Sequence, residues 1–397
     1  MNDGVTSVKK IDMNEATRLT RLGRLDEAMA VLRGEPVSVE AASVEPGADA
    51  TPDAAGFIEM TQTGAGWRAA FAQDASSPAP RKRSAKAKLG GLADLVNLHN
   101  NFKVPGGLHP AAHRPLPPGA TFDALTFSNA AGSRSYRLYV PSTYTGRPAP
   151  LIVMLHGCTQ SPEDFAAGTK MNDLAETHGF LVAYPQQSQA ANMNLCWNWF
   201  NAADQQRDAG EPSIIAGITR QVLADKTIDA RRVFVAGLSA GGAMAVIMGA
   251  TYPELYAAVG VHSGLAVGAA HDMPSAFTAM GQGTKPLRHP RGTALVPTIV
   301  FHGDADLTVN VRNGDHVIAQ AGRSARLKQS STLATSPGGM TYTATAHSNA
   351  RQAVLEHWLV HGAGHAWSGG DASGSYTEPR GPDASAEMVR FFLKQKR

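Results

Sequence analysis

One serine in the chain has neighbours that are typical of a nucleophile. The segment Gly237-Leu238-Ser239-Ala240-Gly241 directly follows an apolar run at 233–236 and opens a segment with helical character. A sharp turn from strand to helix brings backbone into close approach, so the flanking positions must lack side chains. The turn exposes the hydroxyl beside a helix N-terminus, which favours negative charge. We therefore expect Ser239 to be a nucleophile.

A serine nucleophile needs a general base and a carboxylate that orients this base. After a strand–turn–helix serine, the carboxylate precedes the histidine in the chain. Two carboxylates, Asp304 and Asp306, follow the apolar run at 298–301. Asp306 lies deeper in the loop and fits the pattern HGxxDxxV, so it is predicted to orient the base. Asp304 is expected to stabilise the loop.

The base must be chosen among the histidines that follow Asp306. The candidates are His316, His347, His357, His361 and His365. His365 lies in the glycine-rich stretch 362–367, just after the last expected strand. Such a loop can place an imidazole beside Ser239, so His365 is the predicted base.

Backbone amides complete the expected site. The run at 151–155 ends in His156-Gly157-Cys158, and in this kind of site an amide from that loop joins the amide after the nucleophile. The predicted donors to an oxyanion are the N–H groups of Cys158 and Ala240. The Cys158 side chain has two possible states, which the sequence leaves open: a disulfide with Cys196, or one of two buried free thiols.

Aromatic residues cluster near the expected mouth of the site. Trp197, Trp199 and Trp367 are predicted to contact an apolar substrate, with ordinary packing under a loop as the alternative. Residues 262–297 are rich in glycine, alanine, methionine and proline, and they form either a lid or substrate wall or a passive insertion.

The elements that must position these residues alternate between strand and helix. Strands are predicted at 121–127, 134–140, 151–155, 180–184, 233–236, 257–261, 298–301 and 357–360, and helices at 162–176, 213–226, 240–252, 311–321 and 384–395. The first two strands read as an antiparallel hairpin. The alternation after them predicts an α/β fold with a mainly parallel central sheet flanked by helices.

The first third of the chain has a different composition. Residues 1–34 contain an amphipathic helix at 12–33, which either packs on its own chain or targets it to a polymer granule surface. Residues 35–119 carry few large apolar side chains and are expected to be a mostly disordered linker. The catalytic domain is expected at 120–397.

Composition excludes several classes of protein. A net charge of +3 is too small to indicate nucleic-acid binding, and no apolar run is long enough to cross a membrane. Two cysteines cannot form a four-cysteine zinc site. No apolar leader follows Met1, so a cytoplasmic location is favoured, with an extracellular one as the alternative. The oligomeric state is left open.

Five motifs together resemble the poly(3-hydroxybutyrate) depolymerase family of esterases, which is similar to feruloyl and acetylxylan esterases. They are HGCTQSPEDFA at 156–166, CWNWF at 196–200, GLSAGGAM at 237–244, HGDADLTV at 302–309 and GHAW at 364–367. The resemblance covers about 120–395 and implies an α/β-hydrolase fold that cleaves esters without a metal or a cofactor. It implies Ser239, Asp306 and His365 as the triad and places Cys158 in the oxyanion loop.

The expected function is therefore a serine esterase that acts on poly(3-hydroxybutyrate)-type polyester or its oligomers. A feruloyl or acetylxylan esterase is the alternative within enzymes. A granule-associated binding protein is the alternative from another class. The expected partner is the ester substrate, with a polyester granule surface as a further candidate.

Overall fold

The computed structural model describes residues 59–63, 66–70, 115–283, 295–323 and 325–397. The chain divides into two units, Met1–Leu89 and Gly90–Arg397. In the first unit, β1 (Glu59–Thr63) and β2 (Gly66–Ala70) form an antiparallel pair. The structure describes only parts of the segment 35–119, so the mostly disordered linker expected there stays a prediction. The expected helix at 12–33 lies outside the described residues.

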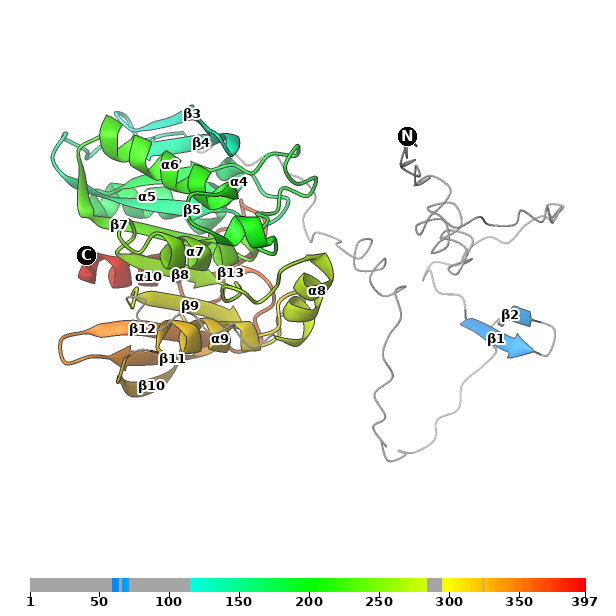
Figure 1. Ribbon diagram of the computed structural model, residues 1–397. Coiled ribbons are helices and arrows are strands. Elements are labelled where there is room, and N and C mark those ends of the chain that lie inside the picture. The colour runs from blue at the N-terminus through cyan, green and yellow to red at the C-terminus, as the bar shows by residue number, and fades with distance from the viewer. Residues whose placement is uncertain (1–58, 64–65, 71–114, 284–294, 324) are drawn as a thin grey trace, which may run out of the picture. The chain divides into compact units, whose positions relative to one another are not determined.

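A ten-stranded sheet runs through the second unit (Figure 1). Its strands in chain order are β3 (Thr121–Asn129), β4 (Gly132–Val140), β5 (Ala149–Leu155), β6 (Leu181–Pro185), β7 (Ile228–Leu238), β8 (Ala258–His262), β9 (Thr298–Gly303), β10 (Lys328–Thr335), β11 (Thr341–Ser348) and β12 (Ala353–Val360). Their order across the sheet is β10-β11-β12-β9-β8-β7-β5-β6-β4-β3. The strands from β12 to β6 are parallel to their neighbours, and antiparallel pairs flank them on both sides. The predicted mainly parallel α/β sheet is confirmed.

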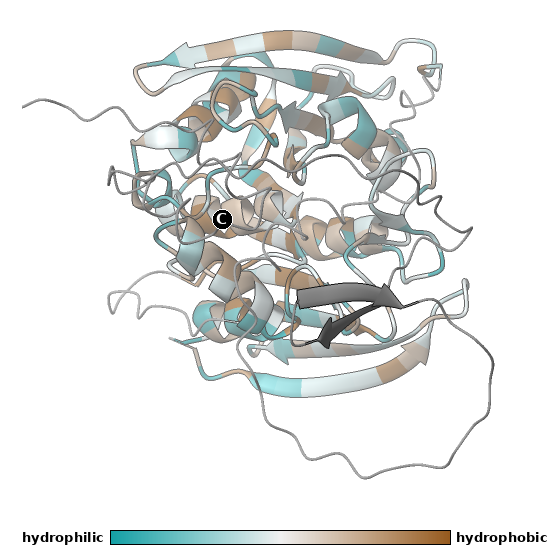
Figure 2. Cartoon of the chain, turned by 90° about the vertical axis from the view of Figure 1, so that its right-hand side faces the viewer, coloured by the Kyte–Doolittle hydropathy of each residue, from teal (hydrophilic) through white to brown (hydrophobic). Residues whose placement is uncertain are grey.

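Helices cover both faces of this sheet because successive strand side chains point to opposite sides. On β5, Leu151, Val153 and Leu155 join one core cluster, whereas Ile152 and Met154 join the other. The first cluster includes residues of α6 (Gly210–Asp225), α7 (Ala240–Thr251), α8 (Met273–Gln282) and α9 (Arg312–Ala321). The second includes residues of α4 (Pro162–Thr169), α5 (Met171–His178) and α10 (Ala384–Lys394). Figure 2 shows the hydrophobic colour gathered on the central strands and on these helices.

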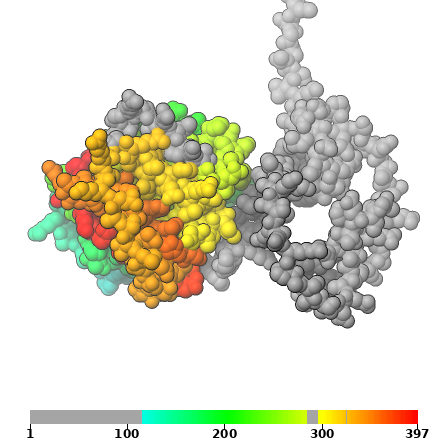
Figure 3. Space-filling view, turned by 90° about the horizontal axis from the view of Figure 1, so that it is seen from below, coloured from blue at the N-terminus to red at the C-terminus, as the bar shows by residue number. Residues whose placement is uncertain are grey.

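The edge strand β10 and its neighbour β11 were not expected from the sequence. Almost every residue of β10 is exposed, and the strand lies at the surface seen in Figure 3. The sequence of β10, KQSSTLAT, has no apolar face, so the period-two signal of a half-buried strand is absent. The short pair β13 (Trp367–Ser368) and β14 (Thr377–Glu378) and the 3-10 helix η1 (Ala202–Gln205) complete the described elements. No helix among the described residues is long and apolar enough to cross a membrane.

Candidate active site

Ser239 lies in a tight turn between β7 and α7. Its backbone angles are φ 57° and ψ −119°, a conformation with positive φ that residues other than glycine rarely adopt. Its N–H donates to the His262 carbonyl at 2.9 Å, which ties the turn to the end of β8. A Cβ on Gly237 would lie 2.4 Å from the Gly241 backbone, and one on Gly241 would lie 2.0 Å from the Leu155 carbonyl oxygen. The two glycines are therefore required for the turn that presents the serine.

Asp306 and His365 form a direct hydrogen bond. His365 Nδ1 lies 2.7 Å from Asp306 Oδ2, and a carboxylate only accepts, so Nδ1 carries the hydrogen. The other ring nitrogen, Nε2, is left as the basic one. The second carboxylate oxygen, Oδ1, accepts from the N–H groups of Thr308 at 2.9 Å and Val309 at 2.8 Å. The acid is thus fixed at both oxygens.

The electrostatics of this pair favour an ionised Asp306. Burial alone would raise the pKa of Asp306, but the N–H groups of His302 and His365 beside the carboxylate outweigh it and hold that pKa well below its usual range. Burial also lowers the pKa of the neighbouring His262 to about 3, so this ring is neutral at pH 7. The negative charge of Asp306 is therefore available to stabilise a protonated His365.

All three predicted side chains come from loops at one edge of the sheet. Ser239 follows β7, Asp306 follows β9 and His365 follows β12, and the carboxyl ends of these parallel strands share an edge. The acid and base loops touch: Asp304 N–H donates to the Val360 carbonyl at 3.1 Å, and Ala305 N–H to the Ala363 carbonyl at 3.0 Å. Asp304 also accepts from His361 Nδ1 at 2.8 Å and from Gly362 N–H at 2.7 Å. It thus stabilises the loop, as expected.

The loop after β5 is held by a disulfide. The sulfur atoms of Cys158 and Cys196 are bonded at 2.05 Å. Of the two states that the sequence left open, the structure therefore has the disulfide and not the two free thiols. The Thr159 N–H donates to the Asn194 carbonyl at 2.7 Å, so the same two loops are joined a second time. Within the described part of the chain, the N–H groups of Cys158 and Ala240 donate to no protein acceptor. Both predicted oxyanion donors are therefore available to a bound group.

A buried polar network supports the loop that carries Cys196. Glu211 is 3% exposed, and it accepts from Asn198 N–H at 2.7 Å and Asn198 Nδ2 at 2.8 Å. Gln187 bonds Glu211 and also donates to the Cys196 carbonyl at 2.9 Å. Arg134 Nε donates to Gln187 Oε1 at 2.8 Å. Burial raises the pKa of Glu211, against the hydrogen bonds from Gln187 and Asn198. No local sequence pattern indicates this network, because its members lie far apart in the chain.

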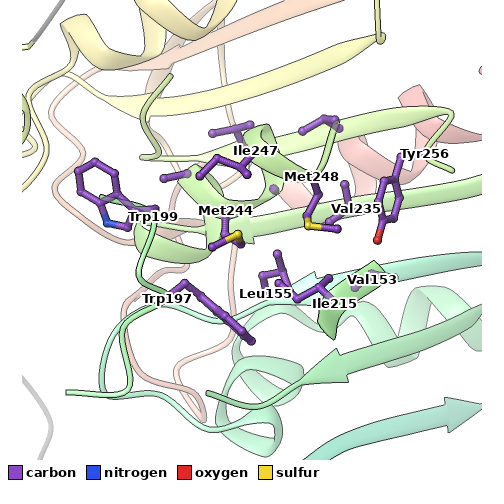
Figure 4. Packing of buried hydrophobic residues seen from close by; sticks show 14 of the residues in the cluster. Val153, Leu155, Trp197, Trp199, Ile215, Val235, Met244, Ile247, Met248 and Tyr256 are labelled. Carbon is purple, nitrogen blue, oxygen red and sulfur yellow. The ribbon is translucent and has the colours of Figure 1, made fainter. Parts of the chain in front are cut away.

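Two of the tryptophans predicted to contact the substrate are buried in the core, as in the alternative of ordinary packing under a loop. Trp197 is 0% exposed and packs against His156, with ring centroids 5.6 Å apart. Trp367 is 1% exposed, stacks on His262 at 5.2 Å and donates from Nε1 to Ser385 Oγ at 3.0 Å. Both rings are packed inside because their loops fold back over the core. Figure 4 shows Trp197 beside Leu155 and Met244.

Trp199 is also largely buried, and the segment 262–297 is described only in part. Trp199 is 5% exposed and meets Phe200 edge to face, so it is also mainly a core residue, and only a narrow edge of it can meet a ligand. Residues 262–297 include α8, while 284–294 lie outside the described residues. Both alternatives for this segment, a lid or substrate wall and a passive insertion, therefore stay predictions. Among the described residues, no group of three or more potential ligands could hold a metal ion.

The sheet and the turn at Ser239 together define a structural class of proteins. A mainly parallel sheet with a strained serine between strand and helix, followed in the chain by an acid and then a histidine at the same edge, is the arrangement of the α/β-hydrolases. Residues 134–336, just over half of the chain, match the model of the family described as Esterase PHB depolymerase. The chain belongs to this family.

Similar proteins agree with this assignment. The chain is 33% identical over 252 residues to poly(3-hydroxyalkanoate) depolymerase C of Paucimonas lemoignei, covering 60% of each chain. It is 37% identical over 140 residues to feruloyl esterase B of Neurospora crassa, covering 35% of this chain and 46% of that one. The solved acetyl xylan esterase from Aspergillus awamori shares the fold, with a TM-score of 0.55 and 21% identity over 69% of this chain and 99% of that one. The chain spans roughly half of the length of the curated relatives it matches.

Proposed function

We propose that the protein is a carboxylic ester hydrolase that works through an acyl-enzyme on Ser239. The observation that carries this proposal is the His365–Asp306 hydrogen bond at the sheet edge where the turn exposes Ser239. A fixed tautomer with a free Nε2 is what a general base for a serine requires. Membership in an esterase family supports the same chemistry.

The mechanism follows from these groups. Ser239 Oγ attacks the ester carbonyl carbon while His365 Nε2 takes the hydroxyl proton, and Asp306 stabilises the imidazolium. The tetrahedral oxyanion accepts hydrogen bonds from the N–H groups of Cys158 and Ala240. Its collapse breaks the ester C–O bond, and His365 returns the proton to the leaving alcohol. Water, deprotonated by His365, then attacks the acyl-enzyme and releases the acid.

The first test compares the wild type with Ser239→Ala on p-nitrophenyl butyrate. We expect the variant to lose activity by about 10⁴-fold or more, because the covalent route disappears. A control variant, Ser263→Ala, removes a nearby buried hydroxyl that has no proposed role in the reaction. If Ser239→Ala hydrolyses the ester as fast as the wild type, the proposal fails.

For the substrate we propose a polyester of the poly(3-hydroxybutyrate) type, or its oligomers. The relative named poly(3-hydroxyalkanoate) depolymerase C supports this choice. Two large apolar side chains support it independently: Leu307, beside Asp306, is 98% exposed, and Met193, beside the disulfide-held loop, is 87% exposed. We infer that these two side chains are contact points for an extended apolar polyester.

A substrate panel separates this proposal from its alternative. Feruloyl and acetylxylan ester hydrolysis is the second candidate, because relatives with those names also match the chain. We expect hydroxybutyrate oligomers and amorphous polyester films to be hydrolysed faster than methyl ferulate or acetylated xylan. Leu307→Ser is expected to lower film hydrolysis severalfold while hydrolysis of p-nitrophenyl butyrate stays unchanged. Equal activity of the variant on films would remove the argument from the exposed side chains.

We propose that the protein works in an oxidising compartment, in place of the cytoplasmic location that the sequence favoured. The Cys158–Cys196 disulfide supports this, since cytosolic chains usually keep such thiols reduced. Rapid alkylation of cells followed by mass spectrometry should find both cysteines protected. Full alkylation of both would refute the proposal.

A further inference from the structure

A second histidine holds the turn that carries Asp306. His302, at the end of β9, places Nε2 2.8 Å from the Val309 carbonyl oxygen. A carbonyl only accepts, so His302 Nε2 carries a hydrogen and donates it. Val309 N–H in turn donates to Asp306 Oδ1 at 2.8 Å. Both backbone polar groups of Val309 are therefore fixed, one by the acid and one by His302.

The same ring also faces the acid directly. His302 Nε2 lies 3.5 Å from Asp306 Oδ2, the oxygen that accepts from His365 Nδ1. The side chains of His302 and Asp306 are both 0% exposed, so no bulk solvent screens this contact. Asp306 Oδ2 thus lies between two imidazole N–H groups. One belongs to the proposed base, and the other belongs to a ring that the proposed mechanism does not use.

The rear of the His302 ring is blocked by α9. A Cβ on Gly314 would lie 3.0 Å from His302 Nδ1 and 3.1 Å from His357 Nε2. The missing side chain lets the helix backbone press against both rings, and His302 has no room to move away from Asp306. Burial lowers the pKa of His357 to about 4, so this neighbour is uncharged at neutral pH.

We propose that His302 is a positioning residue for Asp306, with Gly314 as its support from behind. His302 does not touch the substrate or the reacting atoms. It holds the Asp306 carboxylate at the angle that His365 Nδ1–H needs, by clamping Val309 and by its own contact with Oδ2. This inference rests on the proposed esterase function, because it assigns a role within that triad.

The test uses the full chain and three variants. His302→Leu keeps the bulk and removes the donor; His302→Gln keeps an N–H near the position of Nε2; Gly314→Ala pushes the ring from behind. For His302→Leu we expect kcat on p-nitrophenyl butyrate to fall about 100-fold with KM unchanged, as for a misplaced catalytic group. His302→Gln should recover most of that loss, and Gly314→Ala should lower kcat by about 10-fold. Active-site titration with a phosphonate normalises each rate to folded protein.

Two further measurements separate positioning from plain structure. The downfield proton resonance of the His365–Asp306 hydrogen bond should persist in His302→Gln and be lost or shifted in His302→Leu. His361→Gln, which removes the other histidine–aspartate pair of these loops, serves as the matched control and should change kcat by less than about threefold. Ser239→Ala must be inactive in the same assay, which establishes the triad independently of His302.

The outcomes are distinct. An unchanged kcat per active site in His302→Leu overturns the positioning role while leaving the esterase intact. Equal losses in His302→Leu and His302→Gln also overturn it, because the donor would then be irrelevant. If neither variant folds by circular dichroism, Gly314→Ala decides: an unchanged kcat and proton resonance refute the inference.

Discussion

The two sides of the site are held by different means. On the oxyanion side, the loop after β5 is fixed by a covalent bond between Cys158 and Cys196 and by the Thr159–Asn194 backbone hydrogen bond. On the acid–base side, the loops after β9 and β12 are fixed by hydrogen bonds alone, centred on Asp306. The oxyanion donors are backbone amides, whereas the acid and base are side chains.

This difference matches what each side must do. Amides stabilise a developing charge only if they stay in place, so a rigid loop favours catalysis. His365 must accept a proton and then return it to another atom, so its ring needs a partner that stabilises both of its charge states. The comparison predicts that changes on the acid–base side mainly alter the rate, and that changes on the oxyanion side mainly alter stability.

The largest effect is expected from Asp306→Asn. The amide can present its N–H to His365 Nδ1 and so favours the wrong tautomer, which should lower kcat by about 10⁴-fold with little change in KM. Steady-state kinetics with p-nitrophenyl butyrate measures this. Asp304→Asn, in the same loop, is the control and should lose far less. Similar losses in both variants would show that the loop, and not the acid, is the cause.

The next effect is expected from replacing Cys158 and Cys196 together by serine. The cross-link joins residues 38 positions apart, so its loss should lower the free energy of unfolding by about 3–4 kcal/mol. Urea unfolding followed by fluorescence measures this. The kcat should fall much less than in Asp306→Asn, because the Thr159–Asn194 bond remains. A larger loss of kcat than in Asp306→Asn would reverse the comparison.

A third effect, on stability alone, depends on pH and involves both sides of the site. Burial lowers the pKa of His156, beside the oxyanion loop, to about 4 and that of His262 to about 3. The unfolded chain binds these protons near pH 6.5, so it holds more protons than the folded chain below that pH. The free energy of unfolding should therefore fall as pH drops from about 6.5 towards 4, by up to about 1.4 kcal/mol per unit and per histidine.

Urea unfolding at several pH values measures that slope. His262→Gln removes one of the two groups and should reduce the slope. His178→Gln, at an exposed position of α5, should leave it unchanged. A flat stability between pH 6.5 and 5 in the wild type would contradict the prediction.

Much of the fold and the arrangement of the site followed from local patterns. Three signals can be found along the chain itself. They are the glycines on either side of Ser239, the apolar run before it, and the order in which the acid and the histidine follow. The structure places these residues at one sheet edge, and their catalytic roles stay predictions until tested. Patterns that depend on distant residues were missed. The burial of Trp197 and Trp367 depends on how loops fold over the core. The role proposed for His302 depends on Gly314 and Val309, which only the fold brings to its ring.

The backbone of Ser239 has a cost that extends beyond the reaction. A residue other than glycine at φ 57° and ψ −119° stores about 1–3 kcal/mol of conformational strain, which the packing of the surrounding sheet must outweigh. Glycine would release that strain and abolish the nucleophile. At this position, stability and the nucleophile therefore oppose each other. Anyone who seeks a heat-resistant form of this protein should look for stabilising substitutions in the surface strands, far from this turn.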